Sequence, residues 1–308
     1  MKRRYVTVDV FTDRMFGGNP LAVVLDAAGL SAREMQAIAL EFNYSETTFV
    51  LPPKLSANTA QVRIFTPRTE VPFAGHPNVG TAFVLARNSP FGAAAAASAG
   101  GVFLFEEAAG LVALKLLREH GDTVGAEVRA PETLSRRTVV SKEAAAACLS
   151  LDAADIATHV HAPQVISVGL PFLAVEVSSR AALGRSKPDF AAHAELLPLD
   201  GADAVFAYWR AHGEPSATGE TVLHARTFSP LDGVIEDPAT GSACAAAIAL
   251  LTSFEPPDRA EFAWRIHQGV DMGRPSLLLG RTTKSHGAVT ATHIGGRCVA
   301  VFEGTLDL

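Results

Sequence analysis

The chain has 308 residues, of which 48% are hydrophobic and 19% charged, so it is long and apolar enough for two globular domains, each with its own core. Its formal net charge is −6 and its basic residues are scattered, which argues against nucleic acid as a partner, and no uncharged apolar run reaches the length of a membrane span. The three cysteines are far apart and odd in number, which predicts a cytoplasmic protein, and the apolar composition favours a homodimer.

The first part of the chain is dominated by strand signals. Alternating residues predict strands at 5–11 and 21–25 around a Gly-Gly-Asn-Pro turn, and a capping-box pattern at 31–34 opens a helix that ends near Asn43. A β-branched and aromatic strand follows at 44–50, with Glu46 near its start. A further strand at 60–65 leads into a glycine loop.

The middle and the second half continue this pattern. The alanine-rich residues 89–101 predict a surface loop, and the polar residues 120–125 mark the expected crossing between domains. Further strands are predicted at 102–105, 111–117, 165–168, 173–177, 204–209, 221–228, 262–267, 276–279, 287–292 and 297–303, and further helices at 142–149 and 190–196.

The most informative stretch is the polar loop at 236–242 and the apolar run behind it. Residues 243–251 carry no charge and are rich in alanine and leucine, which predicts a helix that is buried on every side. The first N–H groups of a helix have no internal partner, so Asp237, Thr240 and Ser242 are placed to cap this end or to help a bound anion do so.

The same design occurs earlier in the chain. Phe-Thr-Pro at 65–67 recurs as Phe-Ser-Pro at 228–230, and the loop at 72–76 recurs at 238–242, each followed by a charge-free apolar run. We expect two homologous halves, each a sheet curled around one buried helix, with segments 60–87 and 223–252 equivalent. The two helix N-termini are the obvious places for a shared site.

Together these motifs resemble the PhzF-like phenazine-biosynthesis isomerase family, which shares the diaminopimelate epimerase fold. The resemblance runs essentially end to end. It rests on Gly-Asn-Pro at 18–20, Asn-Tyr-Ser-Glu-Thr at 43–47, Phe-Thr-Pro at 65–67, Ala-Gly-His at 74–76, Glu-Asp-Pro-Ala-Thr-Gly-Ser at 236–242, the segment 268–276, and the closing glycines at 295–296 and 304.

The resemblance implies an α+β protein with two homologous domains, each a curled, mostly antiparallel sheet around a central helix. We place the N-terminal domain at 1–120, the C-terminal domain at 121–294, and a closing strand at 295–308 that returns to the first domain. The implied activity is that of an enzyme, an isomerase without cofactor or metal, which moves a proton within a small carboxylated substrate. The type reaction is isomerisation of trans-2,3-dihydro-3-hydroxyanthranilate.

Carried over by motif, Glu46 is the implied general acid/base, while His76 and Asp237 hold or polarise the substrate. The implied substrate-binding residues are Ser45, Gly75, Gly241 and Ser242. Desolvation beside Tyr44 and Phe49 would raise the pKa of Glu46 toward the range in which a carboxyl both takes and returns a proton.

Blander interpretations stand beside these. Glu46 is also typical of a solvated surface carboxylate, and His76 and Asp237 of helix-capping groups. His159 and His161 would share one face of a strand as a metal pair, but no third ligand lies nearby in sequence. Cys244 raises the alternative of a two-thiol racemase or epimerase, and a non-catalytic metabolite-binding protein of the same fold is the other alternative.

Overall fold

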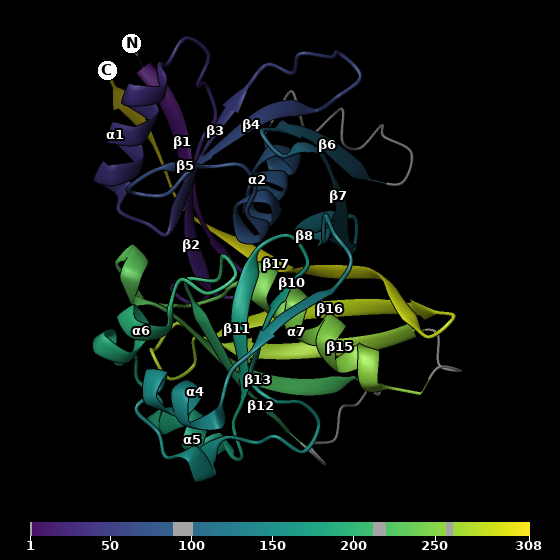
Figure 1. The fold of residues 1–308 in the computed structure, drawn as a ribbon. Coiled ribbons are helices and arrows are strands. Elements are labelled where there is room, and N and C mark those ends of the chain that lie inside the picture. Colours follow the sequence, from purple (N-terminus) through teal and green to yellow (C-terminus); the bar gives the residue numbers. More distant parts are fainter. Residues whose placement is uncertain (1, 89–100, 212–219, 257–260) are drawn as a thin grey trace. The chain divides into compact units, whose positions relative to one another are not determined.

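A computed structural model describes residues 2–88, 101–211, 220–256 and 261–308 (Figure 1). The chain divides into two compact units, one of Met1–Arg129 with Gly295–Leu308 and the other of Ala130–Ile294. The division falls after Arg129 instead of near residue 120 because β7 (Gly110–Glu119) and β8 (Asp122–Arg129) form one antiparallel hairpin that stays within the first unit. The predicted alanine-rich loop lies almost wholly outside the described residues.

The first unit is a closed ring of strands. Besides β7 and β8 it contains β1 (Lys2–Val10), β2 (Asn19–Val24), β3 (Glu46–Leu51), β4 (Ala60–Phe65), β5 (Glu70–Val71), β6 (Val102–Glu107) and the end of β17 (Ala288–Asp307). The ring runs β1, β2, β3, β4, β6, β7, β8 and β17, and β17 pairs back onto β1. The pairs β2 with β3 and β4 with β6 are parallel, and the short β5 lies beside β4.

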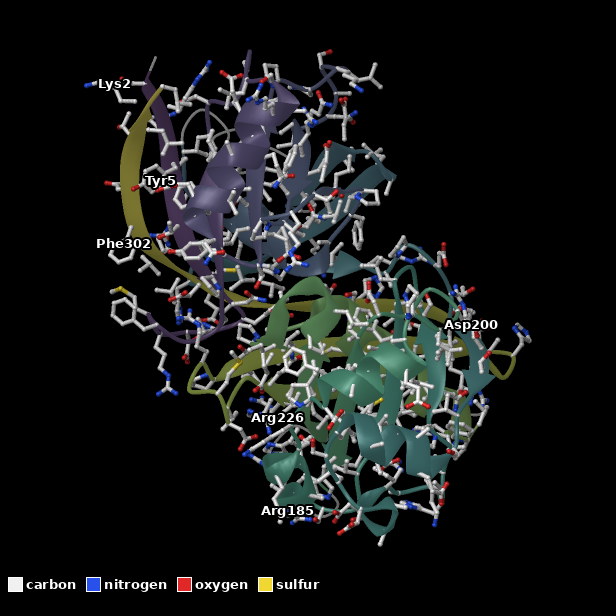
Figure 2. All side chains as sticks on the ribbon, turned by 60° about the vertical axis from the view of Figure 1, so that its left-hand side comes forward. Lys2, Tyr5, Arg185, Asp200, Arg226 and Phe302 are labelled. Atoms are coloured by element: carbon white, nitrogen blue, oxygen red, sulfur yellow. The ribbon has the colours of Figure 1, made fainter. Side chains whose placement is uncertain are left out.

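Helix α2 (Gly75–Arg87) is the core of this unit. Its residues from Gly75 to Leu85 are all buried, as expected for a helix that is apolar on every side. Gly80 allows the close approach of the sheet, since a Cβ there would meet the side chains of Leu21 and Val10 at 2.6 and 2.7 Å. Tyr5 and Phe302 lie on the paired strands β1 and β17 (Figure 2).

Helix α1 (Ala32–Phe42) covers the outside of the first sheet. Its predicted capping box is present, with Ser31 and Glu34 bonded to each other's backbone N–H, and the helix ends at Asn43 in the left-handed region at φ 52°. Its buried residues, Met35, Ile38 and Ala39, pack against Phe49 and Phe65.

The second unit repeats the strand plan of the first. Its strands are β9 (Ser135–Val139), β10 (Gln164–Ser167), β11 (Pro171–Glu176), β12 (Val205–Arg210), β13 (Thr221–Ser229), β14 (Val234–Asp237), β15 (Glu261–Gln268), β16 (Ser276–Ser285) and the first part of β17. Here β11 with β12 and β13 with β15 are the parallel pairs, which matches β2 with β3 and β4 with β6 in the first unit.

Helix α7 (Gly241–Phe254) is the counterpart of α2. It is buried from Gly241 to Thr252 except at Ser242, which is half-buried. In both units a strand, a short strand, a buried helix and a strand parallel to the first follow in order, so the predicted repeat is confirmed. The smaller helices are α4 (Lys142–Cys148), α5 (Arg180–Arg185) and α6 (Phe190–Leu196), with 3-10 turns at Ala153–Asp155 and Pro230–Asp232.

The C-terminal strand departs from the prediction of two separate strands, since β17 is continuous over the glycines at 295–296. These glycines are needed because β8 and β17 approach closely: a Cβ on Gly125 would overlap the carbonyl oxygen of Gly296, and one on Gly295 would lie 2.5 Å from that of Ala126. None of the described helices has the length and apolarity needed to cross a membrane.

Candidate active site

Two predicted site residues meet at the start of α2 in the first unit. Glu46 is the first residue of β3 and lies in register with Leu21 of the parallel strand β2, while His76 is the second residue of α2. His76 Nδ1 lies 3.2 Å from Glu46 Oε2. The His76 side chain is 5% exposed and that of Glu46 19% exposed, so this is a largely desolvated pair.

His76 is uncharged. Burial lowers its pKa to about 3, against a smaller opposing effect of the Pro20 backbone. An ionised carboxylate can only accept, so with Glu46 ionised the Nδ1 atom carries the hydrogen and donates it. Nε2 is buried and has no hydrogen-bond partner among the described residues, which leaves an acceptor in the first turn of the helix.

The framework around this pair is held by local bonds. Thr48 Oγ1 and Thr81 Oγ1 lie 2.8 Å apart and join β3 to α2 inside the core. Ser45 precedes Glu46, and its hydroxyl makes a long, 3.4 Å bond to Asn19 Oδ1. The helix starts after Ala74 without a side-chain cap, because alanine offers none, so the first N–H groups behind Gly75 remain available to an acceptor.

The remaining predicted site residues lie at the start of α7 in the second unit. Thr240 Oγ1 donates to Asp237 Oδ2 at 2.5 Å, and Gly241 and Ser242 are the first residues of the helix. Asp237 is half-buried at the end of β14. As in α2, the N-cap residue, here Thr240, makes no side-chain cap, so this turn also offers backbone donors.

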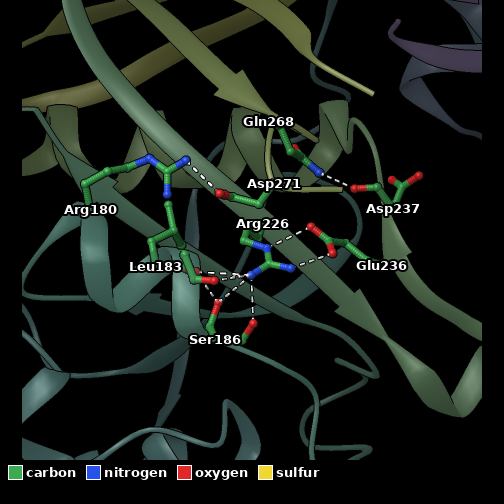
Figure 3. Close-up of polar contacts among 9 residues, drawn as sticks. Arg180, Leu183, Ser186, Arg226, Glu236, Asp237, Gln268 and Asp271 are labelled. Carbon is green, nitrogen blue, oxygen red and sulfur yellow. Dashed lines mark hydrogen bonds and ion pairs between the residues drawn. The ribbon is translucent and has the colours of Figure 1, made fainter. Parts of the chain in front are cut away.

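Gln268, the last residue of β15, fixes this turn. Its Nε2 donates to Asp237 O at 2.9 Å and to the hydroxyls of Thr240 and Thr227 at 3.1 Å each, while its Oε1 accepts from Thr240 N at 3.1 Å. Figure 3 shows Gln268 beside Asp237. Both the amide nitrogen and the amide oxygen of Gln268 are thus hydrogen-bonded to the loop that carries Asp237.

A buried arginine fork holds the residue before Asp237. Arg226 on β13 is 8% exposed and binds both oxygens of Glu236, at 2.8 and 2.6 Å. Its Nη1 also donates to the backbone carbonyls of residues 183, 184 and 186 at the end of α5, at 3.2, 3.3 and 2.7 Å (Figure 3). Neighbouring strand residues point to opposite faces, so a fixed Glu236 also fixes the direction of Asp237.

Cys244 lies behind this turn as a packed residue. It is fully buried and its thiol donates to Gln268 Oε1 at 3.4 Å. Burial, helped by the nearby Asp237 carboxylate, raises the pKa of the thiol far above its usual range. This environment disfavours a thiolate.

The two histidines considered as a metal pair are not on a strand. His159 lies exposed in a bend, whereas His161 is buried and bonded to the Tyr208 hydroxyl through Nε2 and to the Ala162 backbone through Nδ1, at 2.8 Å for the latter. The strand interpretation of 159–161 is therefore wrong, because two bends replace the expected extended backbone. In the described ranges, no group of three or more His, Cys, Asp or Glu side chains is arranged to hold a metal.

Residues 8–304 match the family model of the phenazine biosynthesis-like proteins, PhzC-PhzF. The chain belongs to this family. A trans-2,3-dihydro-3-hydroxyanthranilate isomerase of Pseudomonas chlororaphis is 36% identical over 312 residues, which cover 99% of each chain. An uncharacterized isomerase of Mesorhizobium japonicum is 39% identical over 99% of this chain and 98% of its own. The prediction that this PhzF-family chain is an isomerase is thereby confirmed.

Solved structures agree with the family. A phenazine biosynthesis protein of the PhzF family from Bacillus anthracis has a TM-score of 0.85 at 25% identity, with full coverage of both chains. A hydroxyproline epimerase from Agrobacterium vitis, at 12% identity and a TM-score of 0.61 over 100% of this chain and 93% of its own, shares the fold alone. The predicted diaminopimelate epimerase-like α+β fold is confirmed.

The motif at 268–276 includes Gln268 but does not predict its role, and no motif predicts a role for Arg226 or Glu107. The sequence does carry one signal for Gln268, which stands before a glycine at the end of an alternating strand. In the structure Gly269 has φ +71°, a conformation that favours glycine. A Cβ on Gly269 would lie 2.6 Å from the carbonyl oxygen of Pro238, so this glycine and Gln268 both face the Asp237 loop.

Proposed function

We propose that this isomerase moves a proton within a small carboxylated substrate without a cofactor, and that Glu46 is its general acid/base. The observation that carries the proposal is the contact between Glu46 and an uncharged, buried His76 at the start of α2. A glutamate held in this way is oriented for reaction and remains partly exposed, as a proton-transfer group needs to be.

In the proposed reaction, the Glu46 carboxylate removes a proton from one carbon of the substrate. The electrons of the broken C–H bond shift into the adjacent π system, and the protonated Glu46 returns a proton to another carbon, forming a new C–H bond. Nothing is oxidised or reduced overall. Neutral His76 orients Glu46 through Nδ1 and offers Nε2 to a donor on the substrate.

The substrate carboxylate would be bound by backbone N–H groups at an uncapped helix start, with Gly75 at the start of α2 beside Ser45. Gly241 and Ser242 offer backbone donors of the same kind at the start of α7, where Asp237 could accept from a donor of a substrate. The relatives named trans-2,3-dihydro-3-hydroxyanthranilate isomerases make that compound the first substrate to test. The thiol alternative receives no support from Cys244, whose burial disfavours the thiolate.

Steady-state kinetics on trans-2,3-dihydro-3-hydroxyanthranilate test the proposal. Glu46→Gln keeps the shape and removes the base, so kcat should fall by about 10³–10⁴-fold while binding of a substrate analogue persists. Glu41→Gln, an exposed glutamate of α1, is the matched control. Should Glu46→Gln retain a near wild-type kcat, Glu46 is not the shuttle; a wild-type protein that binds the compound without turnover would instead favour the metabolite-binding alternative.

A further inference from the structure

Glu107 is a buried carboxyl group with no role in the reaction described above. It is the last residue of β6, and both of its carboxyl oxygens are buried without a hydrogen-bond partner among the described residues. The polar side chain that affects the pKa of Glu107 is that of Asn78, the fourth residue of α2. An ionised carboxylate in such a place would leave its strongest acceptors unsatisfied, which is costly.

The internal repeat gives this pair a counterpart. Gln268 is the last residue of β15 and Cys244 the fourth residue of α7, and β15 pairs in parallel with β13 as β6 does with β4. Glu107 and Asn78 therefore occupy the places of Gln268 and Cys244. Gln268 is a neutral amide that donates at one end and accepts at the other, and a protonated carboxyl group can do the same.

Asn78 has an acceptor available for such a bond. Its Nδ2 donates to the Ala74 carbonyl at 3.1 Å, and its buried Oδ1 has no donor among the described residues. A hydrogen on the Glu107 carboxyl would satisfy this acceptor. A negative charge there would leave the Asn78 Oδ1 acceptor without a hydrogen, although the Asn78 side chain partly favours the anion, and it would lie near the turn that carries His76.

No charged side chain among the described residues is positioned to stabilise a Glu107 anion. From β7 its register partner is Gly110, and from α2 the groups are Asn78 and the neutral His76, itself engaged with Glu46 of β3. The charged groups on β6 and β4 are engaged elsewhere: Glu106 accepts from Lys54 N, Leu55 N and Asn58, and Arg63 forms a bidentate pair with Glu70.

We propose that Glu107 is a positioning residue that works as a neutral carboxylic acid: it donates a hydrogen bond to Asn78, holds the first turn of α2 as Gln268 holds that of α7, and blocks anionic substrate when it ionises. The last part rests on the proposed function, in which this turn receives the substrate carboxylate. The first part concerns only the protein.

The titration of Glu107 fits this role. Burial raises its pKa to about 8, against a partial opposing effect of Asn78. The group is therefore mostly protonated at neutral pH and ionises within a range that is accessible to experiment. An anion formed there would repel a carboxylate approaching the start of α2.

A direct test is NMR of protein labelled with ¹³C at the glutamate carboxyl carbon, with the Glu107 resonance assigned by its absence in Glu107→Gln. We expect it to titrate near pH 8. A Glu107 resonance that titrates below pH 6 would overturn the proposal. This readout does not depend on turnover, so it stands whether or not Glu46 is the proton shuttle.

The second test is the pH dependence of KM. If substrate binds only when Glu107 is protonated, KM of the wild type should rise about tenfold from pH 7 to pH 9, because the competent fraction falls by that factor. Glu107→Gln should remove this rise. The matched control, Glu106→Gln on the opposite face of β6, should keep it. An unchanged alkaline rise in Glu107→Gln would contradict the proposal.

Discussion

The first turns of α2 and α7 occupy equivalent places in the two units, but they differ in how far their polar atoms are hydrogen-bonded. At α7, Gln268 uses both ends of its amide on the Asp237 loop, and Arg226 fixes Glu236 next to it. At α2, His76 Nε2 and Asn78 Oδ1 are buried without hydrogen-bond partners in the part of the chain that the structure describes. The first turn of α7 is thus held by internal hydrogen bonds, whereas the first turn of α2 keeps polar atoms to which a substrate or a proton can bind.

After Glu46→Gln, the largest effect on rate is expected at the first turn of α2. His76→Ala removes the group that orients Glu46, so kcat should fall by about 10²–10³-fold, the range typical of losing one preorganised polar group. Stopped-flow or steady-state assays measure this. His159→Ala, in an exposed bend, is the matched control and should leave kcat unchanged. Equal kcat values for the two variants would show that His76 does not orient Glu46 for reaction.

A change in the hydrogen-bonded first turn of α7 should lower both the stability of the protein and kcat. Gln268→Ala leaves Thr240 N and the Asp237 carbonyl without this partner, at a cost of about 1–3 kcal/mol for a buried group. We expect a lower melting temperature and a kcat reduced by about 10-fold, measured by calorimetry and kinetics on one preparation. A variant with wild-type stability would show that the amide network contributes little.

These differences explain how far the sequence could be read. The two buried helices, the repeat and the capping box at Ser31 follow from local periodicity and spacing. No such signal marks Arg226, because its partners, Glu236 and the carbonyls of residues 183–186, come together with it only in the folded chain. Glu107 beside Glu106 reads as ordinary strand polarity, since alternation alone does not say which of the two carboxyls is buried.

The arginine fork gives a smaller effect on rate. Arg226→Lys keeps the charge but loses the bidentate bond to Glu236, so Asp237 should be less well positioned and kcat should fall by about 3- to 10-fold with little change in KM. Arg185→Lys, which alters an exposed ion pair with Asp155, is the control. A change in KM alone would indicate that Arg226 does not act through Asp237.

Glu107→Gln should change the pH dependence of stability, and this change has a defined sign. The pKa of Glu107 is raised from 4.5 to about 8 on folding, so between these values the folded chain holds a proton that the unfolded chain has lost. This group's contribution to stability is full below pH 4.5, falls as pH rises toward 8, and is constant above. Urea unfolding should show wild type losing on the order of 1–3 kcal/mol relative to Glu107→Gln between pH 5 and pH 8. A constant difference would contradict the raised pKa.

Deuterium transfer tests the central claim most directly. In D₂O, NMR of the product formed by the wild type should show deuterium at the new C–H position, to the extent that the Glu46 proton exchanges with solvent before its return. Glu46→Gln should form no such product, and Cys244→Ala should behave as wild type because that thiol is packed within the core. Deuterated product from Glu46→Gln at a near wild-type rate, together with an inactive Cys244→Ala, would contradict the carboxylate shuttle and favour the thiol.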